Sequence, residues 1–318
     1  MHPTSPAQAA AYAAGGVPSA EAVRDGVFAI AIPLGHRFLP FAFSYAIEDA
    51  AGAIHLVDAG GITTEHLDAL DAALVSVGHT LDDVASVTAT HLHPDHLGLA
   101  ERVRARSGAS IALHRVEQAS VLSPPADLGE LLDLWGVPEQ RRAELIDRPS
   151  PVDPVTADLL LDDGDRLPIP GRDVVVVHTP GHTAGSICLE DAADGLLFTG
   201  DHLLPDQFPG IGVDSSPTGN PVRDYLHSLE RITSFADHEA LPGHGWRFTG
   251  IPARVQVTRA HHARRTSEVA AALAAEPALP LWELASHLTW SAGWQNLGSF
   301  YLRSALMQTA WHRELVLS

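Results

Sequence analysis

Short apolar runs bounded by turn residues recur through the first 250 residues of the chain, and their lengths are typical of β-strands. The expected strands cover residues 27–32, 41–48, 53–57, 84–88, 109–113, 159–161, 173–177, 186–189, 196–199 and 240–241. Apolar side chains recur at helical spacing over 67–77, and a second helix is expected over 97–106. This alternation of strands and helices predicts a layered α/β fold.

Residues 114–157 interrupt the alternation, because six prolines surround two short helical patterns at 128–135 and 139–146. This segment is either a surface excursion or a helical flap over a site, with Trp135 as a candidate apolar wall. Beyond residue 250 the pattern is helical only, over 253–275, 281–288 and 296–311. We therefore expect a flexible leader at 1–25, a catalytic domain at 26–250 and a C-terminal helical domain at 251–318.

The composition is that of a soluble globular protein, with 45% hydrophobic and 19% charged residues. A net charge of −19 argues against a general nucleic-acid binder, although the region from Arg254 onward, with six Arg and four Glu, has a net charge of +2. All 20 basic residues are Arg, which excludes a Schiff-base lysine. Cys188 is the only cysteine, so no intramolecular disulfide can form. With no apolar run near the roughly 20 residues of a membrane span, we expect a cytoplasmic protein.

The strand expected at 84–88 leads into Thr-His-Leu-His-Pro-Asp-His-Leu-Gly, residues 90–98. This stretch places four metal-ligand side chains, His91, His93, Asp95 and His96, within six positions. Alternate side chains of an extended segment share a face, so His91 and His93 can point at one metal ion. Pro94 forces a turn that directs the next two side chains to a second point nearby. Imidazole nitrogens and carboxylate oxygens are ligands of Zn²⁺.

Three further ligand-type side chains follow other expected strands, namely His182, Asp201 and His244. Side chains beyond strand ends are where α/β folds place their chemistry. The complete set is sufficient for two metal ions. One ion can be held by His91, His93 and His182. The other can be held by Asp95, His96 and His244, with the Asp201 carboxylate bridging the two.

These motifs resemble those of the metallo-β-lactamase superfamily, in its glyoxalase-II-like hydrolase branch. The matching segments lie in the family's order at 57–60, 91–98, 180–183, 199–201 and 242–245. The resemblance implies a four-layer αβ/βα sandwich with a dinuclear zinc site at one edge of the two sheets. It also implies that Asp58 orients a ligand loop by hydrogen bonding, and that the C-terminal helices form a small winged-helix-like domain.

Departures from the family pattern narrow the expected activity. Asp201 stands where the commonest zinc β-lactamases have a cysteine, and His93 stands where flavin-linked di-iron members have a glutamate. Glyoxalase II itself binds glutathione with basic residues that include lysine, and this chain has no lysine. An acyl-CoA or a carrier-bound acyl group is therefore favoured over a glutathione thioester.

The expected function is hydrolysis of a small acyl thioester or ester by hydroxide generated at two Zn²⁺ ions, with iron or manganese as alternative metals. Asp201 would bridge the metals, and Asp95 would bind one metal and accept a proton. Three alternatives stay open: a lactonase, an RNA-cleaving nuclease of the same fold, and a persulfide dioxygenase with a single iron. His202 and Phe208 are candidate substrate contacts, beside Trp135. The expected partner is a small acyl substrate; a homodimer is an open alternative, and membrane or nucleic-acid contact is disfavoured.

Overall fold

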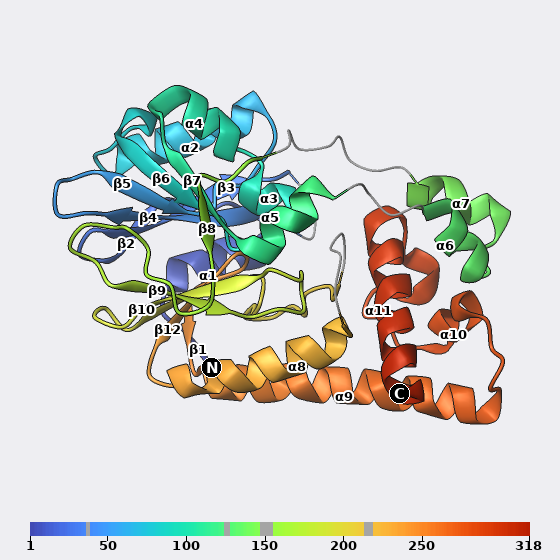
Figure 1. Ribbon diagram of the computed structural model, residues 1–318. Coiled ribbons are helices and arrows are strands. Elements are labelled where there is room, and N and C mark those ends of the chain that lie inside the picture. Colours follow the sequence, from blue (N-terminus) through green and yellow to red (C-terminus); the bar gives the residue numbers. More distant parts are fainter. Residues whose placement is uncertain (36–38, 124–127, 147–154, 213–218) are drawn as a thin grey trace.

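The computed structural model describes residues 1–35, 39–123, 128–146, 155–212 and 219–318 (Figure 1). Two β-sheets pack face to face, and helices cover the outer face of each sheet (Figure 1). This confirms the αβ/βα sandwich predicted from the sequence. A separate group of helices stands beside the sandwich and includes the C-terminus (Figure 1). None of the helices in the described ranges combines the length and the apolar character that a membrane span requires.

The first sheet has seven strands in the order β2-β3-β4-β5-β6-β7-β8. Their bounds are β2 Glu21–Arg24, β3 Val27–Pro33, β4 Phe41–Glu48, β5 Ile54–Val57, β6 Val84–Thr88, β7 Ser110–His114 and β8 Leu159–Leu161. The strands from β2 to β5 pair antiparallel, whereas the pairs β5–β6, β6–β7 and β7–β8 are parallel. The parallel strands bring their carboxyl ends to one edge of the sheet.

The second sheet has six strands in the order β1-β13-β12-β11-β10-β9. Their bounds are β1 His2–Pro3, β9 Val174–His178, β10 Ile187–Asp191, β11 Leu196–Gly200, β12 Glu239–Pro242 and β13 Phe248–Thr249. Of these pairs only β11–β12 is parallel. The sequence pattern missed the two-residue strands β1 and β13 and also β2, because segments this short give no periodicity to detect.

The core between the two sheets is built from alternate residues of facing strands. Phe41, Phe43 and Tyr45 of β4 share one face because strand side chains alternate, and each is at most 2% exposed. They pack against residues of the second sheet that include Phe198, whose ring lies 5.3 Å from that of Tyr45. Burial of these aromatic rings accounts for much of the attraction between the sheets.

Helices bury the outer faces of both sheets. On the first sheet, α2 (Thr64–Ser76) and α4 (Ala100–Ser107) contribute Leu70, Leu74 and Val103 to a buried apolar cluster. On the second sheet, a similar cluster is covered by α8 (Pro221–Arg231) and by α9 (Ile251–Ala275). Shorter helices occupy the connections: η1 Leu81–Asp83, α3 Pro94–Leu97, α5 Arg115–Leu122 and η2 Ile232–Phe235.

The helical group beside the sandwich combines two segments that are distant in the sequence. It contains α6 Leu128–Leu134, α7 Glu139–Ile146, α10 Leu281–His287, η3 Trp294–Asn296 and α11 Ser299–Leu317. Leu132 and Leu145 share one buried cluster with Leu302 of α11, and the backbone N–H of Trp282 donates to the carbonyl of Trp135 at 2.9 Å. The described part of the 114–157 segment therefore packs on the C-terminal helices, while 124–127 and 147–154 lie outside the described residues.

Trp135 belongs to this cluster and is 7% exposed. Its apolar surface joins α6 to the C-terminal helices, and its role as an apolar wall of the site stays a prediction. The helices predicted beyond residue 250 are confirmed. Residues 251–318 contain no strand, so the two-stranded wing of a winged-helix domain is absent from them.

The first 25 residues, expected to be a flexible leader, are ordered instead. Helix α1 (Pro6–Ala13) starts after Ser5, whose hydroxyl accepts from the backbone N–H of Gln8 at 3.2 Å. Gln8 is fully buried and accepts from the backbone N–H of Arg247 at 3.1 Å. The ring of Tyr12 lies 5.4 Å from that of Trp246. These tertiary contacts could not be predicted from the sequence, because the segment is rich in alanine and shows little periodicity of polar and apolar residues.

A close backbone approach supports the loop that carries the histidine motif. A Cβ atom added at Gly60 would collide with the carbonyl oxygen of Asp95. The neighbouring backbones are also joined by hydrogen bonds, from Ala59 N to the carbonyl of His96 at 2.7 Å and from Gly61 N to that of Pro94 at 3.0 Å. The loop after β5 thus fixes the backbone of the motif after β6.

We predict that Gly60→Ala lowers the free energy of unfolding by about 1–3 kcal/mol, because the added methyl displaces the Asp95 backbone. The variant should also bind less metal. Urea denaturation and metal analysis measure the two effects. Gly16→Ala is the matched control, since its Cβ would meet only the carbonyl oxygen of Ala11 at 3.5 Å. Unchanged stability and metal content in Gly60→Ala would show that this contact does not position the motif.

Candidate metal centre

The seven predicted ligand side chains meet at one edge of the sandwich. The histidine motif follows β6 of the first sheet and includes α3. The remaining three ligands follow β9, β11 and β12 of the second sheet. Strand ends of both sheets therefore supply the site, which explains how residues up to 153 positions apart in the chain, such as His91 and His244, converge.

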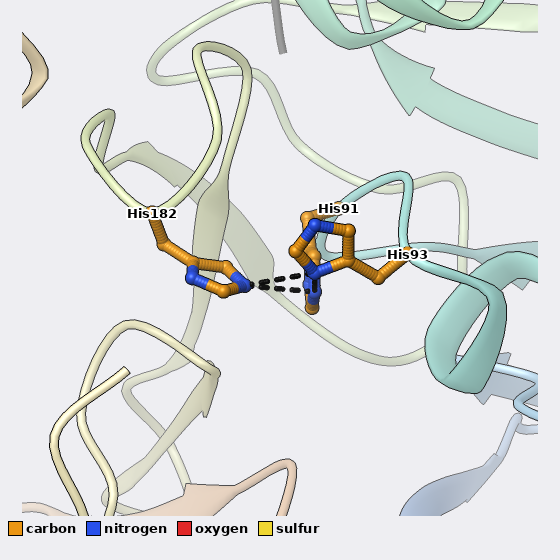
Figure 2. A group of neighbouring side chains, drawn as sticks. All are labelled: His91, His93 and His182. Carbon is orange, nitrogen blue, oxygen red and sulfur yellow. Dashed lines mark hydrogen bonds between the residues drawn. The ribbon is translucent and has the colours of Figure 1, made fainter. Parts of the chain in front are cut away.

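Three histidine nitrogens form the first half of the centre. Figure 2 shows His182 approaching His91 and His93 from the opposite side, with the ring nitrogens turned toward one another. His91 Nε2 lies 3.0 Å from His93 Nδ1, and His182 Nε2 lies 3.2 Å from the former and 3.0 Å from the latter. Three ligands of a tetrahedral ion with Zn–N bonds of about 2.0–2.1 Å have nitrogens about 3.3 Å apart. The cluster therefore fits one metal ion.

The second half of the centre is formed by Asp95, His96 and His244. His244 Nε2 lies 3.2 Å from Asp95 Oδ2, and His96 Nε2 lies 3.9 Å from the same oxygen. The side-chain nitrogen or oxygen atoms of these three residues lie within 4.8 Å of one another. A Cβ at Gly243 would come within 2.5 Å of the His96 ring, so glycine leaves the space that the cluster requires.

Asp201 lies between the two halves. Its Oδ1 is 3.4 Å from His96 Nε2 and 3.5 Å from His244 Nε2, whereas its Oδ2 is 3.8 Å from His182 Nε2. One carboxylate oxygen thus faces each cluster, which is the arrangement of a bridging ligand. Among the described residues, Asp201 Oδ1 and the Nε2 atoms of His96 and His244 are buried without a hydrogen bond of acceptable geometry. Cations are the partners that such lone pairs fit.

Hydrogen bonds set the tautomer of four of the five histidines. In each case Nδ1 donates to a fixed acceptor, so Nε2 presents its lone pair to the centre. The acceptors are Thr90 Oγ1 for His91 at 3.1 Å, Asp58 Oδ2 for His96 at 2.7 Å, the Gly210 carbonyl for His182 at 2.7 Å and the Phe41 carbonyl for His244 at 2.9 Å. His93 faces the first cluster with Nδ1 instead.

Asp58 occupies the supporting position implied by the resemblance. Besides the bond to His96, its two carboxylate oxygens accept from the backbone N–H of Thr90 at 2.6 Å and from the Thr90 hydroxyl at 2.9 Å. Asp58 has a φ of 63°, a left-handed conformation that aspartate tolerates better than most residues. Through Thr90 the same carboxylate also orients His91, so one side chain aligns a ligand of each cluster.

Burial and neighbouring charges shift the pKa values of the ligand side chains in both clusters. Burial lowers the pKa of His182 to about 4, which keeps this imidazole neutral and free to bind a metal. Burial opposes the ionisation of Asp95, but His96 and His244 hold the pKa of its carboxyl well below the usual range. Burial also disfavours the cationic form of His96, yet Asp201, Asp58 and Asp95 raise its pKa to about 9. A metal ion would therefore replace protons in the second cluster, so metal binding would release protons.

The two remaining pocket candidates are His202, which directly follows Asp201, and Phe208 in the loop after β11. His202 is 1% exposed, and its carbonyl accepts from the hydroxyl of Tyr225 at 2.7 Å, so it packs beneath the second sheet. Its ring packs against that of Tyr225 with 5.0 Å between centroids, and its contact with the substrate stays a prediction. Phe208 is partly exposed and stacks on His261 of α9 at 3.9 Å. It lies between the loop after β11 and α9, with the Arg254 guanidinium 4.8 Å from its ring centroid.

Three residues near the centre were not predicted from the sequence. Thr90 and Glu117 are buried and bonded to ligand-bearing loops, but no pattern distinguished them. Tyr301 of α11 is the third: burial raises the pKa of its phenol, and the negative charge of Asp95 raises it further. Helix α11 therefore brings Tyr301 within electrostatic range of the metal centre. Only the position of Thr90 at the start of the histidine motif could have indicated a role.

Comparison with known proteins agrees with this geometry. Residues 38–244 match the family model described as Metallo-beta-lactamase superfamily. A solved structure, the metallo-beta-lactamase family protein TTHA1429 from Thermus thermophilus, superposes with a TM-score of 0.78 at 28% identity, covering 93% of this chain and 94% of that one.

Two similar proteins have names that state an enzymatic activity. The chain is 32% identical over 166 residues to the acyl-coenzyme A thioesterase MBLAC2 of Gallus gallus, covering 49% of this chain and 54% of that protein. It is 27% identical over 238 residues to the probable metallo-hydrolase YqjP of Bacillus subtilis (strain 168), covering 71% and 74%. The chain thus spans about half the length of the thioesterase. With the family match and the ligand geometry together, the chain belongs to the metallo-beta-lactamase superfamily.

Proposed function

We propose that this protein is a dinuclear, metal-dependent hydrolase that cleaves small acyl thioesters of the acyl-CoA type. The observation that carries the proposal is the position of Asp201, whose two carboxylate oxygens face two separate ligand clusters. Two metal ions about 3.5–4 Å apart can activate one water between them, which suits hydrolysis. A relative named as an acyl-coenzyme A thioesterase supports the choice of substrate class.

Zinc is the metal that we propose for both positions. Three imidazoles form the first cluster, and two imidazoles with carboxylates form the second. Zn²⁺ binds both ligand types, and a catalytic zinc site keeps one position for water or substrate. Iron and manganese accept the same ligands, so the proposal depends on two metals in the centre more than on their identity.

When bound, the metals supply a water of lowered pKa and an electrophile for the substrate carbonyl. The protein itself holds the ligands in fixed positions and supplies a carboxylate that accepts a proton. The Asp95 side chain is 24% exposed, against 12% for Asp201, so it is the carboxylate more open to solvent. We assign it the role of receiving the proton from the attacking water. A thiolate leaving group needs little acid assistance, which agrees with the lack of a second free acid among the seven ligands.

The alternatives are less well supported by the structure. A lactonase would use the same ligands on a cyclic ester, and no contact of the described residues favours a ring. A persulfide dioxygenase with a single iron would need only two histidines and one aspartate, whereas both clusters are complete. A nuclease is disfavoured because the chain has a net charge of −19, which repels the phosphates of a nucleic acid.

We predict that the zinc-loaded protein hydrolyses acyl-CoA thioesters with a higher kcat/KM than lactones, β-lactams or single-stranded RNA. Thiol release, followed with a thiol-reactive chromophore, measures the first reaction, and product chromatography measures the others. Addition of a chelator should abolish activity, and zinc should restore it. A preference for a lactone or for RNA would replace the proposed substrate, and chelator-resistant thioesterase activity would contradict the metal mechanism.

We predict that Asp201→Ala binds one metal ion fewer per chain and loses at least about 10²-fold in kcat/KM, because the bridging carboxylate aligns both metals and their charge on the transition state. Metal content by mass spectrometry and steady-state kinetics test this. Asp68→Ala removes the same charge from the exposed face of α2 and serves as the control. Two tightly bound metals and full turnover in Asp201→Ala would refute the bridging assignment.

A further inference from the structure

Glu117 of α5 is a buried carboxylate that bridges two of the ligand-bearing loops. It is 1% exposed, although glutamate is among the residues least often buried. Its Oε1 accepts from the backbone N–H of Leu92 at 2.6 Å and from the hydroxyl of Thr183 at 2.7 Å. Its Oε2 accepts from the backbone N–H of Gly185 at 2.8 Å. One side chain thus satisfies three donors from two separate loops.

Each of these donors is close in sequence to a ligand of the first cluster. Leu92 lies between His91 and His93, and Thr183 directly follows His182. The Leu92 loop follows a strand of the first sheet, and the Thr183 loop joins β9 to β10 of the second. Glu117 therefore connects the two sheets at the point where the three-histidine cluster has to be assembled from both.

The contact between Glu117 and the Thr183–Gly185 loop is closely packed, and its hydrogen bonds have a defined direction. A Cβ added at Gly185 would collide with the backbone nitrogen of Glu117, so the loop and α5 pack without intervening side chains. The backbone N–H of Thr183 donates to the hydroxyl of Ser186 at 3.1 Å, and the two hydroxyls lie 2.6 Å apart. The Ser186 hydroxyl can donate back to Thr183, which leaves the Thr183 proton directed at Glu117.

Helix α5, which carries Glu117, is itself anchored at its start. His114 caps the helix by accepting from the backbone N–H of Val116 at 3.3 Å. Its ring stacks on that of His178, at the end of β9, with 4.0 Å between centroids and 15° between planes. The helix start is therefore fixed against the strand that leads to His182, and Glu117 projects from a rigid base.

We propose that Glu117 is a positioning residue that sets the geometry of the three-histidine metal site by tying the Leu92 loop to the Thr183–Gly185 loop. The inference rests on the metal centre of the proposed function. Without the tie, the relative position of His182 and the His91–His93 pair would depend on the packing of the two sheets and on the backbone hydrogen bond from Ile187 N to the Thr90 carbonyl at 2.9 Å. Hydrogen-bonding partners outside the ligand set commonly fix ligand orientation in this way, and their loss typically costs 10–100-fold in metal affinity.

Burial raises the pKa of Glu117 to about 7, in spite of the three donors, so this carboxylate carries a free-energy cost in the fold. An apolar side chain would avoid this cost but would leave the donors of Leu92, Thr183 and Gly185 without an acceptor. The retention of a costly acid beside the site is consistent with a role in the geometry of the centre.

The direct test is Glu117→Gln, which preserves size but turns one acceptor oxygen into an amide N–H₂ that faces a donor. We expect the affinity for the first metal to fall about 10–100-fold. Competition with a chromophoric zinc chelator measures the affinity. The d–d absorption of Co²⁺ in the first site reports its ligand geometry independently of turnover, and its intensity should change in the variant.

Gln118→Met is the matched control on the same helix. Gln118 is also buried, but its amide bonds to residues after the helical insert, donating to the Val155 carbonyl at 3.0 Å and accepting from Ala157 N at 2.5 Å. We expect Gln118→Met to lower the thermal midpoint while leaving the metal affinity and the Co²⁺ spectrum as in the wild type. This separates loss of stability from loss of site geometry.

Thr183→Val provides a second test should Glu117→Gln fail to fold, because it removes one of the three donors and leaves the acid. It should weaken first-metal binding in the same direction and by less. Wild-type affinity in Glu117→Gln or Thr183→Val, or an equal loss in Gln118→Met, would overturn the proposal. A wild-type protein that binds two metals but cleaves no thioester would contradict the proposed function alone, whereas one that binds no metal would contradict both.

Discussion

Five imidazoles and two carboxylates are packed against one another at a buried edge of two sheets, and this concentration of lone pairs is the constraint on which the structure depends. In the first cluster, three nitrogens lie 3.0–3.2 Å apart. At most one proton can lie between each pair of such atoms, and burial opposes the charged form of His91 and His182. Cations resolve this conflict, which is why the arrangement points to metals and not to a hydrogen-bonded core.

The surroundings of the centre serve to hold these lone pairs in place. Asp58 aligns a ligand in each cluster, directly for His96 and through Thr90 for His91. Backbone carbonyls perform the same function for His182 and His244. Glycines permit the close approaches, as at Gly60 against Asp95. The fold thus supplies the rigid strand ends, and a small number of polar contacts converts them into a site of defined geometry.

Sequence patterns were sufficient to predict which histidine and aspartate side chains converge, and to predict most strands, because both signals are local. The mostly apolar run that becomes β4, buried from Phe41 to Ile47, and the spacing of His91 and His93 can be read from a few neighbouring positions. The packing partners of Trp135 and His202 could not be predicted, because the local sequence gives no indication of which distant element will cover a bulky or polar side chain. The ordered N-terminus and the role of Glu117 also depend on partners far away in the chain.

The helical group beside the sandwich contributes residues near the metal centre that the ligand motifs do not include. Segments 128–146 and 281–317 share one apolar cluster, and α11 stands between the sandwich and the other helices of this group (Figure 1). Tyr301 brings the phenol of that helix within electrostatic range of Asp95. The surroundings of the centre therefore include a phenol from the helical group as well as residues of the sandwich.

The central claim is that two cations share the Asp201 carboxylate. Anomalous X-ray scattering from crystals of the zinc-loaded protein, recorded on both sides of the zinc edge, tests it most directly. The account predicts two peaks per chain about 3.5–4 Å apart, one bound by His91, His93 and His182 and the other by His96 and His244. A single peak, or two peaks remote from Asp201, would contradict it.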